Sequence, residues 1–437
     1  MSAKSSPGLL SVLGVGFGLA GAVGGTIGAG ILRTPGLVAK QLPAPGVVLL
    51  IWVLGGLYAL LGAICVAELA SCLPRAGGWF VYAEAAFGRR LGFLVGWSDW
   101  IAHCIGLAWI VTTLGDYLCD LIPLSSTAIA LLILAVFTAI QWPGVRSGGA
   151  SQELLSLIKA VAFLALVVAC FALPLPSRVE APAHLIAPGS ELLVPVVLAL
   201  QAVITTYDGW ASPIYFAEEF SEPAQALPRS LIGGVLAVAL LYLLINAALL
   251  HVLPMSALAQ SNLPAADAAR LLVGERGGQV INVVALIALL GVTNTVVMAA
   301  PRILFGLGRD GFMPAVVAEV NAGGTPLPAL LITTGSTGLL VLSGSFERLL
   351  GMGAFLYVCL PLSGLIALLV LRRSQPELER PFRCWGYPLT PLLVAGVSLM
   401  FLGAALWSDT MNSLLALALV LSGGLVAEAS NRLKPAA

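Results

Sequence analysis

Residues 9–39 read LLSVLGVGFGLAGAVGGTIGAGILRTPGLVA, and no charged side chain occurs before Arg33. The run is longer than the roughly 20 apolar residues that a helix needs to cross a hydrocarbon layer of about 30 Å. Its centre nevertheless holds the cluster Gly24-Gly25-Thr26-Ile27-Gly28-Ala29-Gly30, and each glycine inside a helix costs about 1 kcal/mol relative to alanine. We therefore predict a spanning helix over 9–39 that is interrupted near the middle of the membrane.

A second apolar segment, 191–219, is interrupted in a similar way. It contains Tyr207-Asp208-Gly209-Trp210 followed by Pro213, and proline removes a backbone hydrogen bond from a helix. Non-helical backbone at membrane depth is tolerated where it lines a cavity or is buried in protein. Paired interruptions in two halves of a chain indicate the binding site of a transporter, whereas glycines that only allow close helix packing are the alternative interpretation.

The remaining sequence consists largely of further apolar runs. Of 437 residues, 59% are hydrophobic and 10% are charged, against about 25% charged residues in soluble domains. Backbone groups in lipid must bond to one another within the segment, so such runs form helices. We predict an all-α membrane protein with about twelve spanning helices, the other ten at 45–72, 91–119, 125–142, 152–174, 229–253, 279–308, 327–343, 348–371, 387–407 and 411–430.

The distribution of basic residues predicts the orientation of these helices. With twelve crossings, 14 Lys and Arg residues fall on the side of the N-terminus and 6 on the opposite side. Basic residues accumulate on the cytoplasmic side of membrane proteins, so we expect both termini in the cytoplasm. The formal net charge is +0, which implies no general attraction to nucleic acid.

The two interruptions predict how a zwitterion could be bound. A helix that starts in mid-membrane offers free N–H groups and a partial positive charge, which suit a carboxylate. A helix that stops there offers carbonyl groups, which suit an ammonium group. We expect the carboxylate to be held by the N–H groups of Gly28, Ala29 and Gly30. We expect the ammonium group to be held near Tyr207 and Gly209, by the carbonyl groups of Ile27, Thr205 and Asp208.

Four charged or titratable residues lie inside the apolar runs, and burial there requires each of them to have a partner. Lys159 lies seven residues into the run 152–174, and a buried ammonium is costly unless it is paired or hydrogen-bonded. It could bond to carbonyl groups of the interrupted first helix, or extend to the membrane interface. Asp208 could cap the second half-helix or accept a proton. Asp99 and His103, four residues apart on one helix face, could form a proton relay or a structural contact.

The residues that enzymes and metal sites require are scarce. The chain has three histidines, His103, His184 and His251, and its seven cysteines show no metal-ligand spacing. No Ser/His/Asp arrangement or pair of neighbouring histidines is present. We therefore expect neither an enzyme nor a bound metal or cofactor.

Several segments together resemble the amino acid–polyamine–organocation superfamily, and in particular its L-amino-acid transporter branch. Lys159 falls where that branch places a lysine. The other matching segments are Thr26 through Pro35, Ala67-Glu68-Leu69 with Leu73 through Gly78, Tyr207 through Trp210 with Glu218-Glu219, and Arg302 through Gly311.

The resemblance implies a five-plus-five inverted repeat, as in the leucine-transporter-like fold, with the first and sixth helices broken. The repeats would occupy 1–178 and 179–375, and two additional helices would occupy 376–437. It also implies a secondary transporter of small neutral L-amino acids in the cell (inner) membrane, working by sodium-independent exchange. Coupling or gating roles would fall to Lys159, Asn294, Trp210 and His103. Proton-coupled symport and a non-transporting amino acid sensor are the alternatives.

Three positions depart from the pattern of this branch. Thr205 stands where an aromatic gate residue is usual, and Ala29 stands where serine is usual. Eukaryotic members pair with a glycoprotein through a loop cysteine, but the loop after Cys119 is very short. We therefore expect no such heavy-chain partner, and the partners expected are the amino acid substrate and the lipid bilayer.

Overall fold

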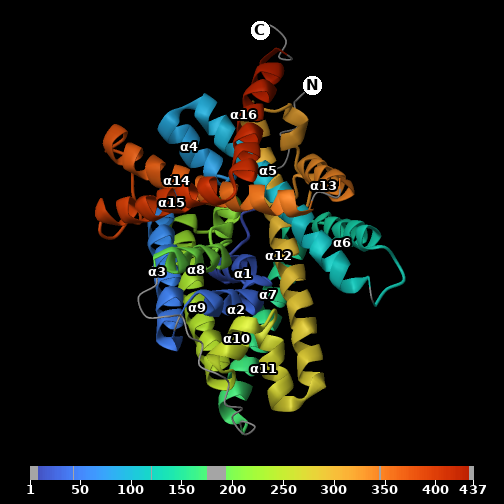
Figure 1. The fold of residues 1–437 in the computed structure, drawn as a ribbon. Coiled ribbons are helices and arrows are strands. Elements are labelled where there is room, and N and C mark those ends of the chain that lie inside the picture. Colours follow the sequence, from blue (N-terminus) through green and yellow to red (C-terminus); the bar gives the residue numbers. More distant parts are fainter. Residues whose placement is uncertain (1–7, 43, 120, 175–192, 344–345, 433–437) are drawn as a thin grey trace.

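The computed structural model describes residues 8–42, 44–119, 121–174, 193–343 and 346–432. These residues form helices joined by short connections, with no strand among them and one isolated backbone bridge between Leu13 and Phe220. Figure 1 shows the helices gathered into one bundle, with α1 near its centre. His184 and the predicted repeat boundary at residue 178 lie outside the described residues.

Apolar helices account for the predicted spanning segments. Helices α1 (Val15–Thr26) and α2 (Gly30–Gln41) form one span that is bent by 47°. The described long spans are α3 (Pro45–Cys72), α5 (Arg89–Leu118), α7 (Val145–Ala172), α9 (Pro223–Val252), α12 (Glu275–Arg309), α14 (Phe346–Ser374) and α15 (Leu389–Ser408). Shorter apolar helices are α6 (Ser126–Gln141), α8 (Leu193–Thr206), α13 (Leu327–Leu342) and α16 (Thr410–Arg432). The all-α membrane architecture predicted from the sequence is confirmed.

The sequence analysis missed several short helices between the spans. These are α4 (Trp79–Phe87), α10 (Met255–Gln260), α11 (Pro264–Val273) and the 3₁₀ helix η2 (Ala315–Ala318). They are too short to stand out in a search for apolar runs of about 20 residues. The second half of the segment 191–219 also differs from the prediction, because it is a 3₁₀ helix, η1 (Ser212–Glu219).

Helix α7 shows how the bundle meets lipid. One stripe of this helix is exposed and apolar, at Leu154, Leu157, Val161, Leu164, Val168 and Phe171. These residues recur every three or four positions, so they share one face. The opposite face is buried and carries Gln152, Ser156 and Lys159. Polar groups of a spanning helix therefore point into the protein, as the absence of water in lipid requires.

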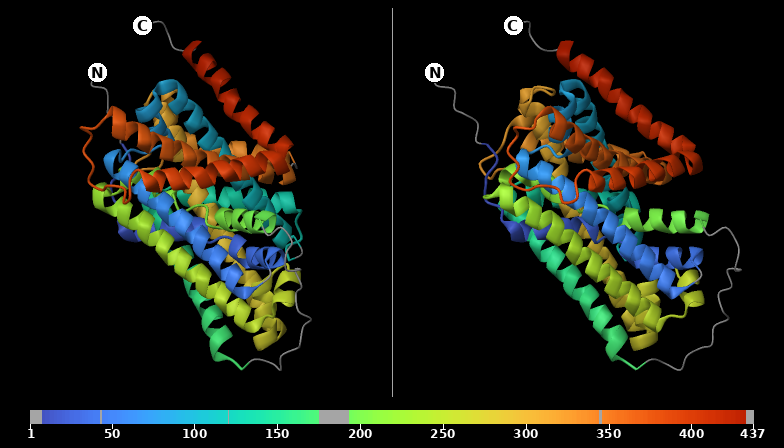
Figure 2. Two further views of the ribbon diagram at one scale, coloured as in Figure 1. Left: turned by 60° about the vertical axis from the view of Figure 1, so that its left-hand side comes forward. Right: turned by 90° about the vertical axis from the view of Figure 1, so that its left-hand side faces the viewer.

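Both ends of the described chain lie toward one end of the bundle. Near the N-terminus, Val12 N–H donates to the carbonyl of Glu219 at 2.9 Å, and Ser221 N–H donates to the carbonyl of Leu13 at 3.0 Å. The first described residues and the far end of α16 lie on the same side of the molecule (Figure 2). Both ends of a chain lie on the same side of a membrane when the chain crosses it an even number of times.

Candidate functional site

The two interruptions cross and touch through their backbones. Helix α1 ends at Thr26, α2 begins at Gly30, and residues 207–211 form a turn between α8 and η1. Gly209 has φ +101° within this turn, and a Cβ atom on it would lie 2.4 Å from the carbonyl oxygen of Gly25. A Cβ atom on Gly25 would lie 2.9 Å from the carbonyl oxygen of Gly209. Glycine is therefore required on both sides of the crossing.

A cavity of about 630 Å³ lies against this crossing. It is lined by both interruptions and by residues of α5, α12 and α14. Of the residues predicted for the site, the cavity is lined by Gly28, Ala29, Gly30, His103, Thr205, Asp208, Gly209 and Trp210.

The start of α2 offers hydrogen-bond donors to the cavity. Among the described residues, the N–H groups of Ala29, Gly30 and Ile31 have no acceptor. The N–H group of Gly28 differs, because it donates to the carbonyl of Thr26 at 2.9 Å. Unpaired N–H groups together with the positive end of the helix dipole make this a place for an anion.

Lys159 is fully buried and lies outside the cavity lining. Its Nζ donates to the carbonyl oxygens of Gly24 at 2.7 Å and Ile27 at 2.9 Å. These are the contacts that the sequence analysis anticipated from the end of the first half-helix. They connect α7 to α1 at the interruption, and they leave the Ile27 oxygen already engaged. The Ile27 side chain is itself fully buried.

Tyr242 on α9 is a site residue that the sequence analysis missed. Its hydroxyl lies 3.0 Å from the carbonyl oxygen of Thr26 and 3.3 Å from that of Thr206, which are the last residues of α1 and α8. One side chain therefore serves the C-terminal ends of both half-helices. The available signal was a tyrosine inside an apolar run, since a buried tyrosine hydroxyl usually finds a partner.

Tyr207 and Asn294 also lie outside the lining of the large cavity. The Tyr207 ring packs against Trp52 and Tyr242, and its hydroxyl donates to the Trp52 carbonyl at 3.3 Å. Asn294 is buried in a network that joins α12 to α6 and α7, through bonds with Gln141 at 2.7 Å, Ser151 at 3.1 Å and Gln152 at 2.9 Å. In this structure both residues position helices around the cavity.

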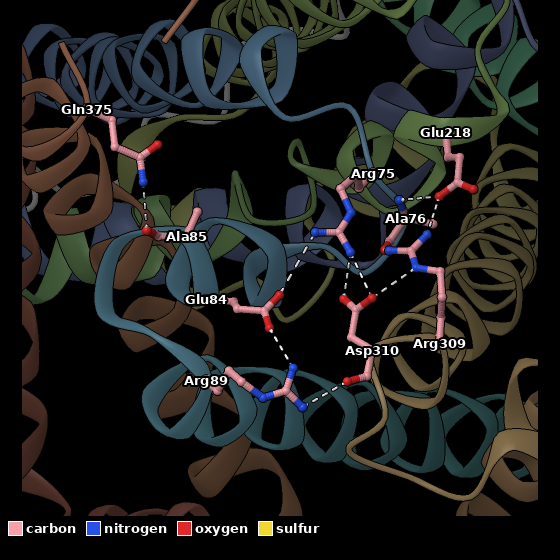
Figure 3. Close-up of polar contacts among 9 residues, drawn as sticks. All are labelled: Arg75, Ala76, Glu84, Ala85, Arg89, Glu218, Arg309, Asp310 and Gln375. Atoms are coloured by element: carbon pink, nitrogen blue, oxygen red, sulfur yellow. Dashed lines mark hydrogen bonds and ion pairs between the residues drawn. The ribbon is translucent and has the colours of Figure 1, made fainter. Parts of the chain in front are cut away.

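Ion pairs close the end of the molecule at which the termini lie. Arg75 bonds to both carboxylate oxygens of Asp310 at 2.8 Å, and Glu84 lies between Arg75 and Arg89 (Figure 3). Arg309 joins Asp310 to Glu218 in the same group. Burial and the nearby Asp310 carboxylate raise the pKa of Glu84, against the opposing effect of the arginines.

A deeper ion pair lies beneath this network. Arg302 Nε is 2.9 Å from Glu219 Oε1, and the two side chains are 1% and 0% exposed. The exposed residues in the cavity lining are Gly30, Arg33, Leu37, Tyr117 and Thr205, and Arg33, Leu37 and Tyr117 lie toward the opposite end. The cavity is therefore sealed toward the termini and open toward the other end.

We predict that Arg302→Met lowers the free energy of unfolding by about 3–5 kcal/mol, because it leaves the buried Glu219 charge without a partner. Arg75→Gln is the matched control, since Arg75 is 44% exposed and an exposed pair contributes about 0–1 kcal/mol. Thermal and chemical unfolding of the purified protein in detergent measure both effects. Similar losses for the two variants would contradict the prediction.

The crossed half-helices and a cavity that opens at one end define a secondary transporter of the alternating-access class. The chain belongs to the amino acid permease family, whose model matches residues 8–421. The resemblance to the amino acid–polyamine–organocation superfamily is thereby confirmed. The protein is accordingly a multi-pass membrane transporter of amino acids and not an enzyme.

Similar proteins span most of the chain. The serine/threonine exchanger SteT of Bacillus subtilis is 28% identical, over 95% of this chain and 96% of its own. Asc-type amino acid transporter 1 of Mus musculus is 30% identical, over 87% of this chain and 72% of its own. Large neutral amino acids transporter small subunit 2 of Homo sapiens is 26% identical, over 96% of this chain and 79% of its own.

Proposed function

We propose that this protein exchanges small neutral L-amino acids across the cell (inner) membrane without sodium, with both termini in the cytoplasm. The observation that carries the proposal is the crossing of two half-helices, which places free N–H groups and a carboxylate on one cavity wall. The relatives named as a serine/threonine exchanger and as an Asc-type transporter support a small amino acid as the substrate. With cytoplasmic termini, the cavity described above faces outward.

The substrate carboxylate would bind at the start of α2. The N–H groups of Ala29 and Gly30, which line the cavity, are free to donate, and the helix dipole adds to the attraction. The Gly28 N–H group already donates to the Thr26 carbonyl, so the role proposed for Gly28 is to leave space for the substrate. No basic side chain is needed, because an anion at a helix N-terminus is stabilised by the backbone.

The substrate ammonium group would face Asp208 and Thr205, which line the same cavity. Asp208 offers a formal negative charge, and its backbone N–H bonds to the carbonyl of Thr205 at 3.3 Å. The carbonyls of Thr26, Ile27 and Gly24 already accept bonds from Tyr242 or Lys159. The Asp208 carboxylate is therefore the better acceptor for the amine.

Lys159 would replace a bound cation at the interruption. Its ammonium supplies positive charge to the carbonyl oxygens of Gly24 and Ile27 at the end of α1. A sodium ion bound at a broken helix would stabilise carbonyl oxygens in the same way. This supports transport without sodium. We also propose that no glycoprotein partner is needed, because only residues 119–125 connect α5 to α6 and the Cys119 thiol donates to the Asp116 carbonyl.

Gly28→Leu is expected to reduce transport at least about 100-fold, the scale of loss that follows when reacting or binding groups are displaced by about 1 Å. A Cβ atom on Gly28 would meet only Val292 Cγ2, at 3.4 Å. Alanine therefore fits, whereas the leucine side chain must occupy the substrate space. Gly28→Ala is the control and should retain most of the activity. Transport by Gly28→Leu at the wild-type rate would show that Gly28 does not belong to the substrate site.

Counterflow in proteoliposomes tests the proposed function. Vesicles are loaded with unlabelled serine, alanine, leucine or arginine, and entry of the corresponding labelled amino acid is followed without sodium. Entry that requires an internal amino acid supports exchange, and the preferred label identifies the substrate. Entry into empty vesicles driven by a proton gradient supports symport, the second candidate, for which His103 at the cavity wall is the specific observation. Binding without entry of any label would indicate a sensor.

A further inference from the structure

Asp99, in the middle of α5, is a buried carboxylate with few partners. The residue is 0% exposed. Its Oδ1 lies 3.1 Å from His103 Nδ1 and accepts a hydrogen bond from the Tyr215 hydroxyl at 3.0 Å. Its Oδ2 has no hydrogen-bond partner among the described residues. A buried carboxylate is costly unless its charge is balanced, so the protonation of its neighbours matters.

The geometry determines which nitrogen of His103 carries a hydrogen. Nδ1 lies 2.8 Å from the backbone carbonyl oxygen of Asp99. A carbonyl oxygen only accepts hydrogen bonds, so Nδ1 must donate and must carry a hydrogen. In the neutral ring Nε2 is then unprotonated, and it has no recorded partner in the described part of the chain. Because His103 lines the cavity, Nε2 is the atom that can take a proton from cavity water.

The other titratable groups around His103 come from several elements. Asp99 is on the same helix, Tyr215 is on η1 with its ring centroid 4.8 Å away, and Tyr357 on α14 is 6.5 Å away. Asp208 lines the same cavity from the turn 207–211, and Arg33 lines its mouth. The residues of α4 and α12 that line the cavity do not ionise. His103 is therefore the group beside Asp99 that can become a cation.

We propose that Asp99, His103 and Tyr215 form a proton-binding site that is loaded from the substrate cavity and controls transport. A hydronium ion in the cavity gives its proton to His103 Nε2 and leaves as water, and the resulting imidazolium balances the Asp99 carboxylate. The inference rests on the proposed transport function, because it concerns the same cavity.

The proton would act on closure of the cavity around its substrate. Closure removes water, and the energy of an unbalanced charge rises as the surroundings become less polar. With neutral His103, Asp99 would be enclosed with a net negative charge. With protonated His103, the pair is neutral overall. Protonation therefore favours closure, and transport should accelerate as the pH on the open side falls.

Counterflow at different external pH tests the site. Wild-type entry should increase about fivefold or more as the pH falls from about 8 to about 5.5, the range over which histidine changes its charge. His103→Gln and Asp99→Asn should each remove most of this dependence. The control is His251→Gln at the end of α9, where the ring lies 5.2 Å from Phe171. This variant should keep the wild-type pH profile.

A second measurement does not depend on transport. NMR of protein labelled with ¹⁵N-histidine reports the protonation of each ring nitrogen, and His103→Gln identifies the His103 signals among three histidines. Nδ1 should carry hydrogen throughout, and Nε2 should gain one as the pH falls. A flat wild-type profile, an unchanged profile in His103→Gln, or an Nε2 that never protonates would each overturn the site. If wild-type protein shows no counterflow at any pH, the transport function fails, and the NMR titration still decides whether the site binds a proton.

Discussion

Gly209→Leu is expected to abolish amino acid counterflow while the protein remains folded and inserted in the membrane. Gly209 has φ +101°, a conformation that costs a bulky residue about 1–3 kcal/mol. The new Cβ atom would also lie 2.4 Å from the carbonyl oxygen and 2.6 Å from the carbonyl carbon of Gly25. These are backbone atoms of the other interruption, so neither can rotate away. The two half-helices must separate, and the free N–H groups of α2 then lose their position relative to Asp208.

Three measurements separate this effect from general unfolding. Yield in the membrane and elution from size exclusion report folding, and counterflow reports the site. Gly403→Leu on α15 is the matched control, because a Cβ atom there would meet nothing within 4 Å. It should transport at the wild-type rate. Normal counterflow by Gly209→Leu would show that the crossing of the two interruptions is not the binding site.

Lys159→Ala is expected to lower turnover by about tenfold or more. The variant leaves the carbonyl oxygens of Gly24 and Ile27 without their donor, and an unpaired buried polar group costs about 1–3 kcal/mol. It also removes the cation from the C-terminal end of α1, where positive charge stabilises a helix. The end of α1 should then move independently of α7. Substrate binding at the interruption should therefore no longer be coupled to the movement of the surrounding helices.

Lys159→Met distinguishes charge from packing, because methionine fills similar space without a charge or donor. Both variants should be slow if the ammonium group matters, and only Lys159→Ala should be slow if packing decides. Leu157→Ala, at a 62% exposed position on the lipid side of α7, is the control and should behave as wild type. Rates equal to wild type in Lys159→Ala would leave the lysine with no role in transport. Turnover is measured as initial counterflow at saturating substrate.

Much of the fold follows from composition and local pattern. Apolar runs of sufficient length predict the spans, and the two glycine-containing interruptions at 24–30 and 207–210 lie where the structure breaks α1 from α2 and α8 from η1. Lys159 was predicted to bond to carbonyl groups of the interrupted first helix, because a buried ammonium group is costly unless it is paired or hydrogen-bonded. The assignment of residues to two inverted repeats stays a prediction.

The sequence by itself determined that the chain spans a membrane and where its helices break. Which backbone groups at the breaks stay free was decided by the structure, in which Gly28 N–H and the Ile27 carbonyl are engaged. Only the tertiary structure decided that the breaks touch at Gly25 and Gly209 and that Tyr242 serves both half-helices. It also placed Tyr207 and Asn294 outside the cavity lining and His103 within it. The physical reason is that helix breaks come from local backbone energetics, which neighbouring residues set. Which groups share a cavity depends instead on how helices far apart in the chain pack.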